Sequence, residues 1–370
     1  MRFFGPSLSF RNYDWLLTVV IFVLSSIGLA AIYSVDLSLG EKLIFFPTQV
    51  VALFLGLVIS LVISGFHIVT YQSLSRLIYI IAFVLLVVVL IFGTTVRGTT
   101  GWFQIAGFSF QPAEVAKIAL ILFLAWLIHR HGQRFDTWQF VFSSGFFSAL
   151  LVGLIMLQPD LGSSLILVSI WFGLLLLTGV KKRYVFLIFF LGIGVFFVSW
   201  TFLFADYQKD RLTTFLSLDS DPLGAGYNVS QSIIAVGSGN FFGRGLGFGS
   251  QSQLHFLPEA QTDFIFSVLA EELGFVAVLT IFSIYFFMLW RFVKIAKGCS
   301  DDFSTYVVLG VTIYFFTQIV INVGGAIGSL PVTGVTLPFL SYGGSSLIAN
   351  FILIGIVQSV SRSTPFTSHS

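Results

Sequence analysis

Ten long apolar runs constrain the fold of this 370-residue chain more than any other feature. A membrane-spanning helix needs roughly 20 predominantly apolar residues, and the runs approach that length before polar residues, glycine or proline close them. Charged residues make up 9% of the chain, whereas a soluble domain has roughly 25%. The sequence therefore predicts an all-α integral membrane protein with about ten transmembrane helices. We place them near residues 15–34, 43–64, 74–93, 113–129, 139–157, 162–179, 184–204, 264–290, 304–325 and 343–361.

Several function classes are excluded by composition. A net charge of +2 supplies no phosphate-neutralising patch for nucleic acid. The single cysteine, Cys299, excludes an internal disulfide and a cysteine-clustered zinc site. No segment has the strand and helix alternation of a dinucleotide-binding fold, and there is no Walker A sequence. We expect a substrate that lies in the membrane or is presented from outside, and no nucleotide.

The distribution of basic residues predicts the orientation. With ten spans both ends lie on one side, which collects twelve Lys and Arg residues against five on the other. Because basic residues are enriched in cytoplasmic loops, both termini should be cytoplasmic. We treat residues 1–370 as one polytopic membrane domain, with a large extracytoplasmic loop at about 205–262. Eight glycines fall within 224–249, and we expect a compact loop on the membrane surface rather than a floppy linker.

Ionisable residues inside apolar spans are expensive, so each is a functional hypothesis. In FQPAEVAK (110–117), Pro112 suits a first helical turn, and Glu114 and Lys117 share one face. They form either a structural ion pair or a site for a lipid-linked phosphate. In LQPDLGSS (157–164), Asp160 caps the next helix or holds a cation or a sugar hydroxyl.

Acidic residues recur in LPEAQTDFIFSVLAEELG (257–274). Thr262 or Asp263 could cap the helix that follows, but this explains neither Glu259 nor the deeper acidic pair at 271–272. Acids at two depths of one helix suggest a polar cavity.

The stretch NVGGAIGSLPVTGVTLPFLSYGGSS (322–346) contains two prolines and six glycines, so it cannot be one helix. Non-helical backbone at membrane depth is tolerated where it is buried in protein or lines a wet cavity. It therefore points to a cavity on the outer side that Asp263 could share.

Five motifs together carry a resemblance to a known family. They are FQPAEVAK, QPDLGSS, DPLGAGYNVSQSIIAVGSG, FLPEAQTDFIFSVLAEELG and LPFLSYGGSS, in this order along the spans. The chain resembles the SEDS family, the shape, elongation, division and sporulation proteins of bacteria. The stretch SQSQLHFLPEAQTDFIF and the short tail are more similar to the RodA proteins of elongation than to the FtsW proteins of division.

The resemblance implies a peptidoglycan glycosyltransferase. Such enzymes polymerise lipid II into β-1,4-linked glycan at the outer face of the bacterial cytoplasmic membrane, with a divalent cation and a class B penicillin-binding protein as transpeptidase. The family's essential aspartate corresponds to Asp263, and its glutamate–lysine pair to Glu114 and Lys117. Asp263 is either the general base or a ligand of the Mg or Mn ion. The candidates for binding substrate or its diphosphate are Glu114, Lys117, Asp160, Arg211, Glu259, Ser341 and Gly343.

Two other classes compete with the enzyme. Ten spans, buried charges and broken helices also suit a transporter, for instance a flippase for the same lipid. The chain shows no convincing internal repeat, and its charged positions lie toward the outer side rather than the midplane, which favours the enzyme. A scaffold that only recruits the transpeptidase would leave Glu114, Lys117 and Asp263 without a role.

Overall fold

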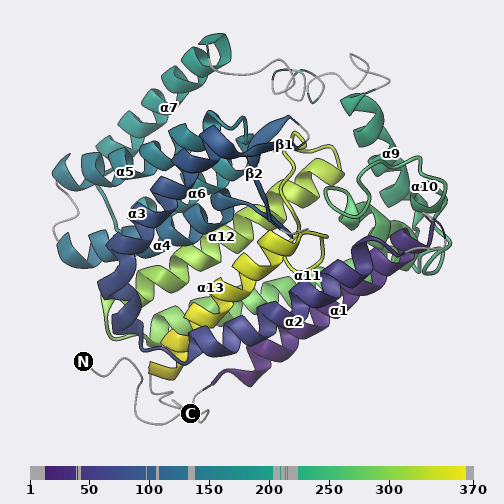
Figure 1. The fold of residues 1–370 in the computed structure, drawn as a ribbon, viewed down its shortest axis with the longest axis horizontal. Helices are drawn as coiled ribbons and strands as arrows, with labels where there is room; N and C mark the ends of the chain where they lie inside the picture. Colours follow the sequence, from purple (N-terminus) through teal and green to yellow (C-terminus); the bar gives the residue numbers. More distant parts are fainter. Residues whose placement is uncertain are drawn as a thin grey trace.

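The computed structural model describes residues 13–38, 40, 43–96, 98–105, 108–131, 138–202, 209, 213, 215 and 224–363. Its elements follow the chain from α1 at the N-terminal end to α13 at the C-terminal end (Figure 1). The long helices are α1 (Trp15–Ser38), α2 (Phe45–Ser64), α3 (Ile68–Phe92), α4 (Pro112–His131), α5 (Trp138–Met156), α6 (Leu161–Leu177), α7 (Lys182–Phe202), α11 (Ile265–Gly298), α12 (Asp302–Ala326) and α13 (Gly344–Ser363). The other elements are β1 (Thr94–Val96), β2 (Thr99–Ile105), β3 (Phe108–Phe110), α9 (Ala225–Ser238) and α10 (Ser250–Gln253).

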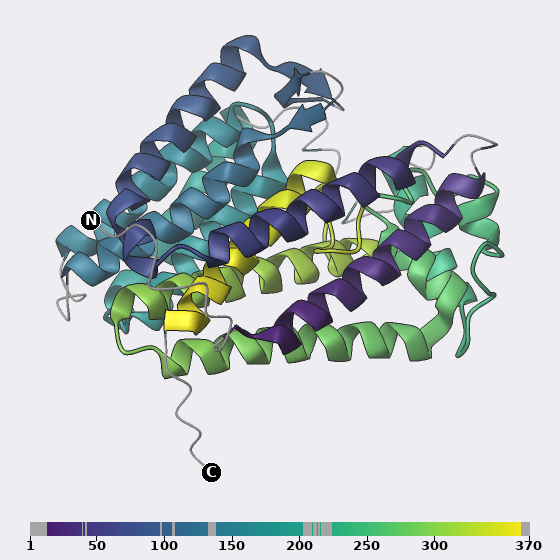
Figure 2. The same ribbon diagram turned by 60° about the horizontal axis from the view of Figure 1, so that its bottom comes forward.

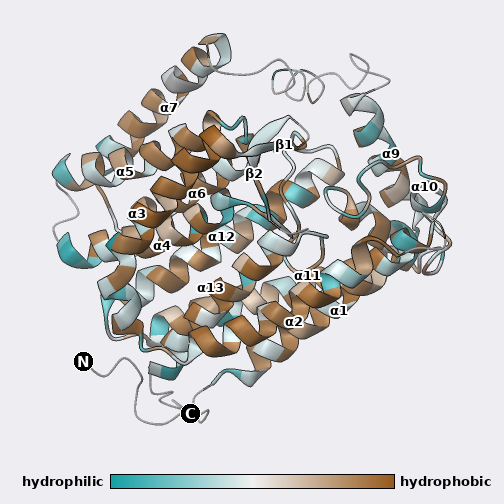
Figure 3. Cartoon of the chain, viewed as in Figure 1, coloured by the Kyte–Doolittle hydropathy of each residue, from teal (hydrophilic) through white to brown (hydrophobic). Residues whose placement is uncertain are grey.

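Within the described part of the chain, nine helices are long and apolar enough to cross a membrane, and α6 is a shorter apolar helix of 17 residues. The prediction of an all-α protein with about ten spans is confirmed. Apolar residues follow the helices, while hydrophilic residues gather toward helix ends and connections (Figure 3). The two largest boundary differences are that α3 begins at Ile68, before the predicted 74, and that α11 continues to Gly298, beyond the predicted 290.

The centre of the bundle is formed by α4 and α13. In their most apolar windows, 83% of α4 and 78% of α13 is buried, against 28% of α2 and α3. Helix α4 packs against α3, α6 and α12, and α13 packs against α2. Gly56 of α2 makes room for the Phe351 ring, which would lie 2.3 Å from a Cβ there. Inside a membrane the lipid tails are as apolar as the side chains, so helices associate through close packing, which small residues allow.

A small antiparallel sheet joins α3 to α4 and was not predicted. Its order is β1-β2-β3, with Val96 opposite Thr99 and Phe103 opposite Phe110. The Ser345 hydroxyl at the start of α13 donates to the Ser109 carbonyl of β3 at 2.6 Å. The sheet is thereby attached to the ends of α4 and α13, where the candidate site residues lie.

Residues 224–264 form α9, α10 and connecting turns, and both helices contact α11. The stretch SQSIIAV lies within α9. The predicted breakage of 322–346 is also confirmed, because α12 ends at Ala326 and α13 begins only at Gly344. Figure 2 shows this non-helical connection between the two helices, at the same end of the bundle as α9.

Candidate functional site

The predicted ion pair of α4 is present. Lys117 Nζ lies 2.7 Å from Glu114 Oε1, three residues away on the same helix face. Lys117 is 2% exposed and Glu114 is 6% exposed, and the ammonium lies 5.8 Å from the centroid of the Tyr314 ring. Either charge alone would be strongly unfavourable at this depth, so each stabilises the other in place.

A polar stripe on α12 connects this pair with the helix end. Tyr314, Gln318 and Asn322 follow at four-residue spacing, which places them on one face. Gln318 Nε2 donates to the Tyr314 hydroxyl at 3.2 Å, and that hydroxyl donates to Asn350 Oδ1 at 2.8 Å. From Tyr314 to Asn322 the helix rises about 12 Å. The sequence reasoning missed this stripe, although regularly spaced polar residues in an apolar span were its visible signal.

Asn322 holds the backbone around Asp263. Its Nδ2 donates to the Asp263 carbonyl at 3.0 Å and to the Val335 carbonyl at 2.8 Å. One Asp263 carboxylate oxygen lies 4.0 Å from the position that a Cβ on Gly334 would occupy, and Gly334 has φ +77°. Asp263 is only partly buried. The start of α11 and the loop before α13 therefore meet at this carboxylate.

The capping role expected of Thr262 or Asp263 is wrong. Helix α11 begins at Ile265, and Phe264 occupies the N-cap position without a side-chain cap hydrogen bond. The carboxylate of Asp263 is thus placed by the loop and by Asn322, and the helix terminus does not require it as a cap.

Ser341 and Gly343 hold the loop in place. The Ser341 hydroxyl donates to the Thr262 carbonyl at 2.7 Å and accepts the Leu337 N–H at 2.8 Å. The Gly343 N–H donates to Gln49 Oε1 at 3.1 Å. Both groups predicted as substrate contacts are therefore engaged with the protein, and they position the loop against α11 and α2.

Asp160 links the ends of α4 and α6. It is the N-cap of α6, where its Oδ1 accepts the Ser163 N–H at 2.9 Å, as expected. Its other oxygen accepts Gln111 Nε2 at 3.0 Å, directly before α4. A Cβ on Gly162 would lie 2.7 Å from the Thr333 carbonyl, so α6 also touches the loop beside Asp263. The carboxylate of Asp160 thus joins the starts of α4 and α6, and Gly162 adds the contact with the loop.

The deeper acids, Glu271 and Glu272, serve a different purpose. Glu271 accepts the backbone N–H groups of Gln251 at 2.9 Å and Ser252 at 3.3 Å, and Glu272 accepts the Ser34 hydroxyl at 2.7 Å. They are 0% and 1% exposed. They clamp α10 and α1 to α11, and the expectation that they line a polar cavity with Asp263 is wrong.

A kink in α11 follows these acids. Gly274 has φ +76°, and the Phe275 N–H donates to the Asn240 carbonyl at 2.9 Å. The next N–H, of Val276, donates to the Phe241 carbonyl at 3.1 Å. The loop after α9 thus supplies the acceptors that the broken helix lacks, as a kink at membrane depth requires.

The remaining candidates lie at the edge of the site or outside the described residues. Glu259, with φ +55°, accepts the Thr262 hydroxyl through its Oε2 at 3.3 Å. Arg211, predicted to bind the diphosphate, lies outside the described residues.

Burial raises the pKa of Tyr342, a hydrogen bond with Thr48 opposes this, and the charge of Asp36 adds to the rise. Tyr342 is therefore a neutral phenol at physiological pH.

Four buried side-chain oxygens along this region have no hydrogen-bond partner within the described ranges: Glu114 Oε2, Gln318 Oε1, Asn322 Oδ1 and Thr333 Oγ1. Buried polar atoms are hydrogen-bonded in the large majority of cases. These oxygens therefore offer acceptor capacity to a molecule rich in hydroxyl or amide donors.

The described residues contain no group of three or more His, Cys, Asp or Glu that could hold a metal ion. Mg²⁺ is usually bound through one or two carboxylates together with substrate phosphates, and does not need an all-protein cage. Asp263, partly exposed at the helix ends, fits this shared mode.

The fold and site define a polytopic membrane protein with ionisable groups at the loop-bearing end of its helices. The family model described as "Cell cycle protein", which covers FtsW, RodA and SpoVE, matches residues 14–365. The chain belongs to this family, as its motifs predicted.

Relatives with different roles are similarly close. Stage V sporulation protein E of Bacillus subtilis is 36% identical, over 94% of this chain and 97% of its own. Peptidoglycan glycosyltransferase MrdB of Escherichia coli is 37% identical, over 87% and 86%. A probable peptidoglycan glycosyltransferase FtsW of Trichlorobacter lovleyi is 35% identical, over 95% and 93%.

Solved structures have the same fold. A chain from a study of how a peptidoglycan synthase complex coordinates polymerization and crosslinking superposes with a TM-score of 0.80 at 30% identity, covering 96% of this chain and 99% of its own. The rod shape determining protein RodA of Thermus thermophilus gives a TM-score of 0.71 at 28% identity, covering 95% and 98%.

Proposed function

We propose that this chain is a peptidoglycan glycosyltransferase that polymerises lipid II at the outer face of the bacterial cytoplasmic membrane, with both termini cytoplasmic. The peptidoglycan glycosyltransferase names of relatives that span most of the chain support the activity. The observation that carries the proposal is the placement of Asp263, held by Asn322 beside the loop before α13. The polar stripe of α12 connects this position with a buried lysine, Lys117.

In this mechanism Asp263 acts as the general base. Its carboxylate takes the proton from the acceptor sugar hydroxyl, whose oxygen attacks the anomeric carbon of the lipid-linked donor. The new glycosidic C–O bond forms as the bond from the anomeric carbon to the diphosphate oxygen breaks, with inversion. Proton removal by a positioned carboxylate typically contributes about 10²–10⁴-fold.

The leaving diphosphate carries the electron pair of the broken bond, so negative charge accumulates on it. Lys117 is the candidate to stabilise that charge, and Glu114 holds its ammonium in place. If Asp263 is instead a cation ligand, the ion that it holds would supply further charge neutralisation at the diphosphate. Whether Asp263 serves as base or ligand is decided by metal dependence: restoration of an Asp263→Glu variant by raised metal concentration would support ligation.

We further propose a role in elongation and shape maintenance, with a class B penicillin-binding protein as the partner. The stretch SQSQLHFLPEAQTDFIF supports the first statement, and the likeness to a chain of a peptidoglycan synthase complex supports the second. Restoration of rod shape in cells depleted of their own elongation polymerase, without rescue of cells depleted of the division polymerase, is the expected result.

The activity is tested with detergent-purified protein and labelled lipid II. Long glycan is expected from the unaltered chain and none from Asp263→Asn. Asp302→Asn, which removes an exposed carboxylate at the start of α12, is the matched control and should keep most of the activity. An active Asp263→Asn variant would remove Asp263 from the mechanism. Movement of lipid II across a bilayer without glycan formation would identify a transporter instead.

A further inference from the structure

The turn of residues 240–245, which follows α9, is bonded through its main chain to α11. The N–H groups of Arg244 and Gly245 donate to the carbonyls of Glu271 at 3.0 Å and Glu272 at 2.9 Å. Just past the kink, two N–H groups of α11 donate in turn to the carbonyls of residues 240 and 241. Four main-chain polar groups of the turn are thus paired with the helix and do not need water.

Glycine allows the two main chains to touch. A Cβ on Gly243 would lie 2.2 Å from the Glu272 carbonyl oxygen, and a Cβ on Gly274 would lie 2.2 Å from the Gly243 nitrogen. Both glycines have φ +76°, a conformation that other residues rarely adopt. The turn and the kinked helix therefore form one unit, and the level of the turn in the membrane is that of residues 271–276 of α11.

The length of α11 measures this level. Tryptophan and basic residues gather at membrane boundaries, and Trp290 is followed by Arg291, Lys294 and Lys297. Gly274 lies 16 residues before Trp290, which corresponds to about 24 Å of helix rise. The hydrocarbon core is about 30 Å thick, and any tilt of the helix reduces the height further. The kink therefore lies about 6 Å or more inside the boundary nearer Asp263.

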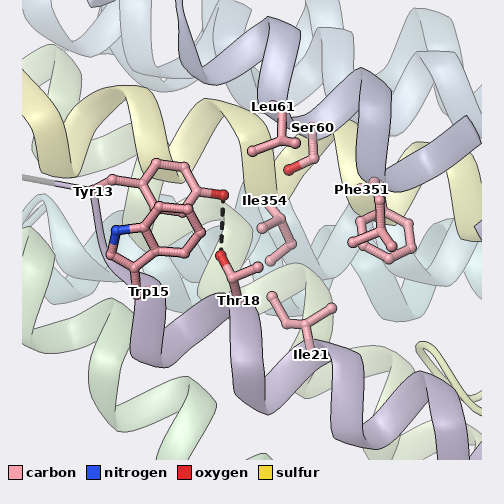
Figure 4. Close-up of a pocket in the computed structure, with 9 residues that line it drawn as sticks. Tyr13, Trp15, Thr18, Ile21, Ser60, Leu61, Phe351 and Ile354 are labelled. Atoms are coloured by element: carbon pink, nitrogen blue, oxygen red, sulfur yellow. Dashed lines mark hydrogen bonds between the residues drawn. The ribbon is translucent and has the colours of Figure 1, made fainter. Parts of the chain in front are cut away.

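Helix α1, which packs against α11, gives a second measure. Tyr13 and Trp15 at its start have ring centroids 4.8 Å apart and line a pocket there (Figure 4), as aromatic residues do at a membrane boundary. The Ser34 hydroxyl, 19 residues beyond Trp15, donates to Glu272 of α11 at 2.7 Å. This separation is about 28 Å of rise, so Glu272 lies just inside a core of about 30 Å. The kink at Gly274 lies deeper.

The side chains around the turn continue the apolar surface of the span. Phe241 and Phe242 are 68% and 84% exposed. The ring of Phe241 lies edge-on to that of Phe275 on α11, with centroids 6.2 Å apart. Val276 and Leu279 extend the exposed apolar surface along the helix. The turn therefore shares the face that this span presents to its surroundings.

The charge in the turn is directed toward the boundary. Arg244 Nη1 donates to the Ser250 hydroxyl at 2.7 Å, and that hydroxyl donates to Glu271 Oε1 at 3.3 Å. Glu271 lies three residues from Gly274 on the boundary side. Arginine near a membrane boundary places its stem among apolar groups and its charged end toward water, and Arg244 fits this pattern.

We propose that residues 240–245 form a re-entrant turn inside the hydrocarbon core, with Phe241 and Phe242 against the acyl chains of the bilayer. Non-helical main chain is tolerated at this depth where its polar groups are buried in protein, and α11 supplies that cover. The stretch was expected to lie on the membrane surface, and the proposal places it below. It goes beyond the proposed polymerase function, and it is tested without any substrate of that reaction.

The test is power-saturation electron paramagnetic resonance of the full chain in phospholipid nanodiscs. Cys299→Ser removes the single native cysteine, and Phe242→Cys then carries a nitroxide label. Oxygen concentrates in the hydrocarbon core, whereas a nickel chelate stays in water. We expect oxygen collisions to exceed nickel collisions, with the label about 6–9 Å inside the boundary. Leu279→Cys, deeper in the same span, is the reference for lipid, and Asp302→Cys, at the exposed start of α12, is the reference for water.

Two results would overturn the proposal. An excess of nickel collisions at Phe242→Cys, as at Asp302→Cys, would place the turn in water. A label shielded from both reagents would show that protein covers the aromatic rings, for instance a second copy of the chain. If Phe242→Cys is not monodisperse, Phe241→Cys carries the label at the same level, and the same outcomes apply.

Discussion

Removing the Glu114–Lys117 charges one at a time, and then together, separates a structural role from a catalytic one. At 2.7 Å and an effective dielectric constant of 20, their attraction is about 6 kcal/mol, which offsets the desolvation of two buried groups. Glu114→Gln or Lys117→Met leaves one charge unpaired at a position no more than 6% exposed. Each single variant should lower the free energy of unfolding by about 3–5 kcal/mol.

The double variant Glu114→Gln/Lys117→Met removes both charges and the penalty for burying them. Its free energy of unfolding should equal that of the unaltered chain or exceed it by up to about 4 kcal/mol. If Lys117 stabilises the leaving diphosphate, the double variant should still lose about 10²–10³-fold in glycan synthesis, as for loss of one electrostatic donor. Unfolding is measured by sodium dodecyl sulfate titration in mixed micelles, and synthesis with labelled lipid II.

The matched control is a second ion pair among the described residues, Asp14–Arg291, at the end of α11 away from Asp263. The double variant Asp14→Asn/Arg291→Met should leave glycan synthesis unchanged. Full activity of the stable Glu114→Gln/Lys117→Met protein would refute the catalytic reasoning and leave the pair as a structural contact. Single variants as stable as the unaltered chain would refute the burial argument itself.

Three further outcomes follow from the packing. Gly239→Ala places a Cβ 1.9 Å from an α11 carbonyl oxygen and should lower Tm markedly in a thermal unfolding assay. Gly237→Ala meets no atom within 4 Å, so in the same assay it should raise the free energy of unfolding by about 0.5–1 kcal/mol. Asp36→Ala leaves the first N–H groups of α2 without their acceptor and should lower the free energy of unfolding by about 1–3 kcal/mol in denaturant titration. Asn322→Leu releases the backbone of Asp263 and should reduce kcat by up to about 10²-fold in the glycan assay. Gel filtration checks that the variant is folded. An unchanged kcat would contradict the positioning role of Asn322.

The spans could be predicted because length and hydropathy are local properties of the chain. The same holds for the Glu114–Lys117 pair, since residues three apart on a helix meet regardless of the fold. The non-helical connection before α13 could be predicted from the prolines and glycines of residues 322–346.

What could not be predicted depends on contacts between distant segments. Asn322 reaches Asp263 across 59 residues, and Glu272 reaches Ser34 across 238. Asp263 and Glu272 are both acids of one motif, and only the tertiary partners show that one is placed at the loop and the other clamps α1. The sheet before α4 was missed because its strands are short and follow a long apolar helix directly.

The kink at Gly274 has a mechanical consequence. Main-chain hydrogen bonds tie residues 240–245 to α11 on both sides of the kink, since the N–H groups of Arg244 and Gly245 donate to the Glu271 and Glu272 carbonyls. Phe242, at the tip of this turn, is 84% exposed. A force on this exposed ring would therefore act, through these main-chain hydrogen bonds, on the turns of α11 on both sides of the kink.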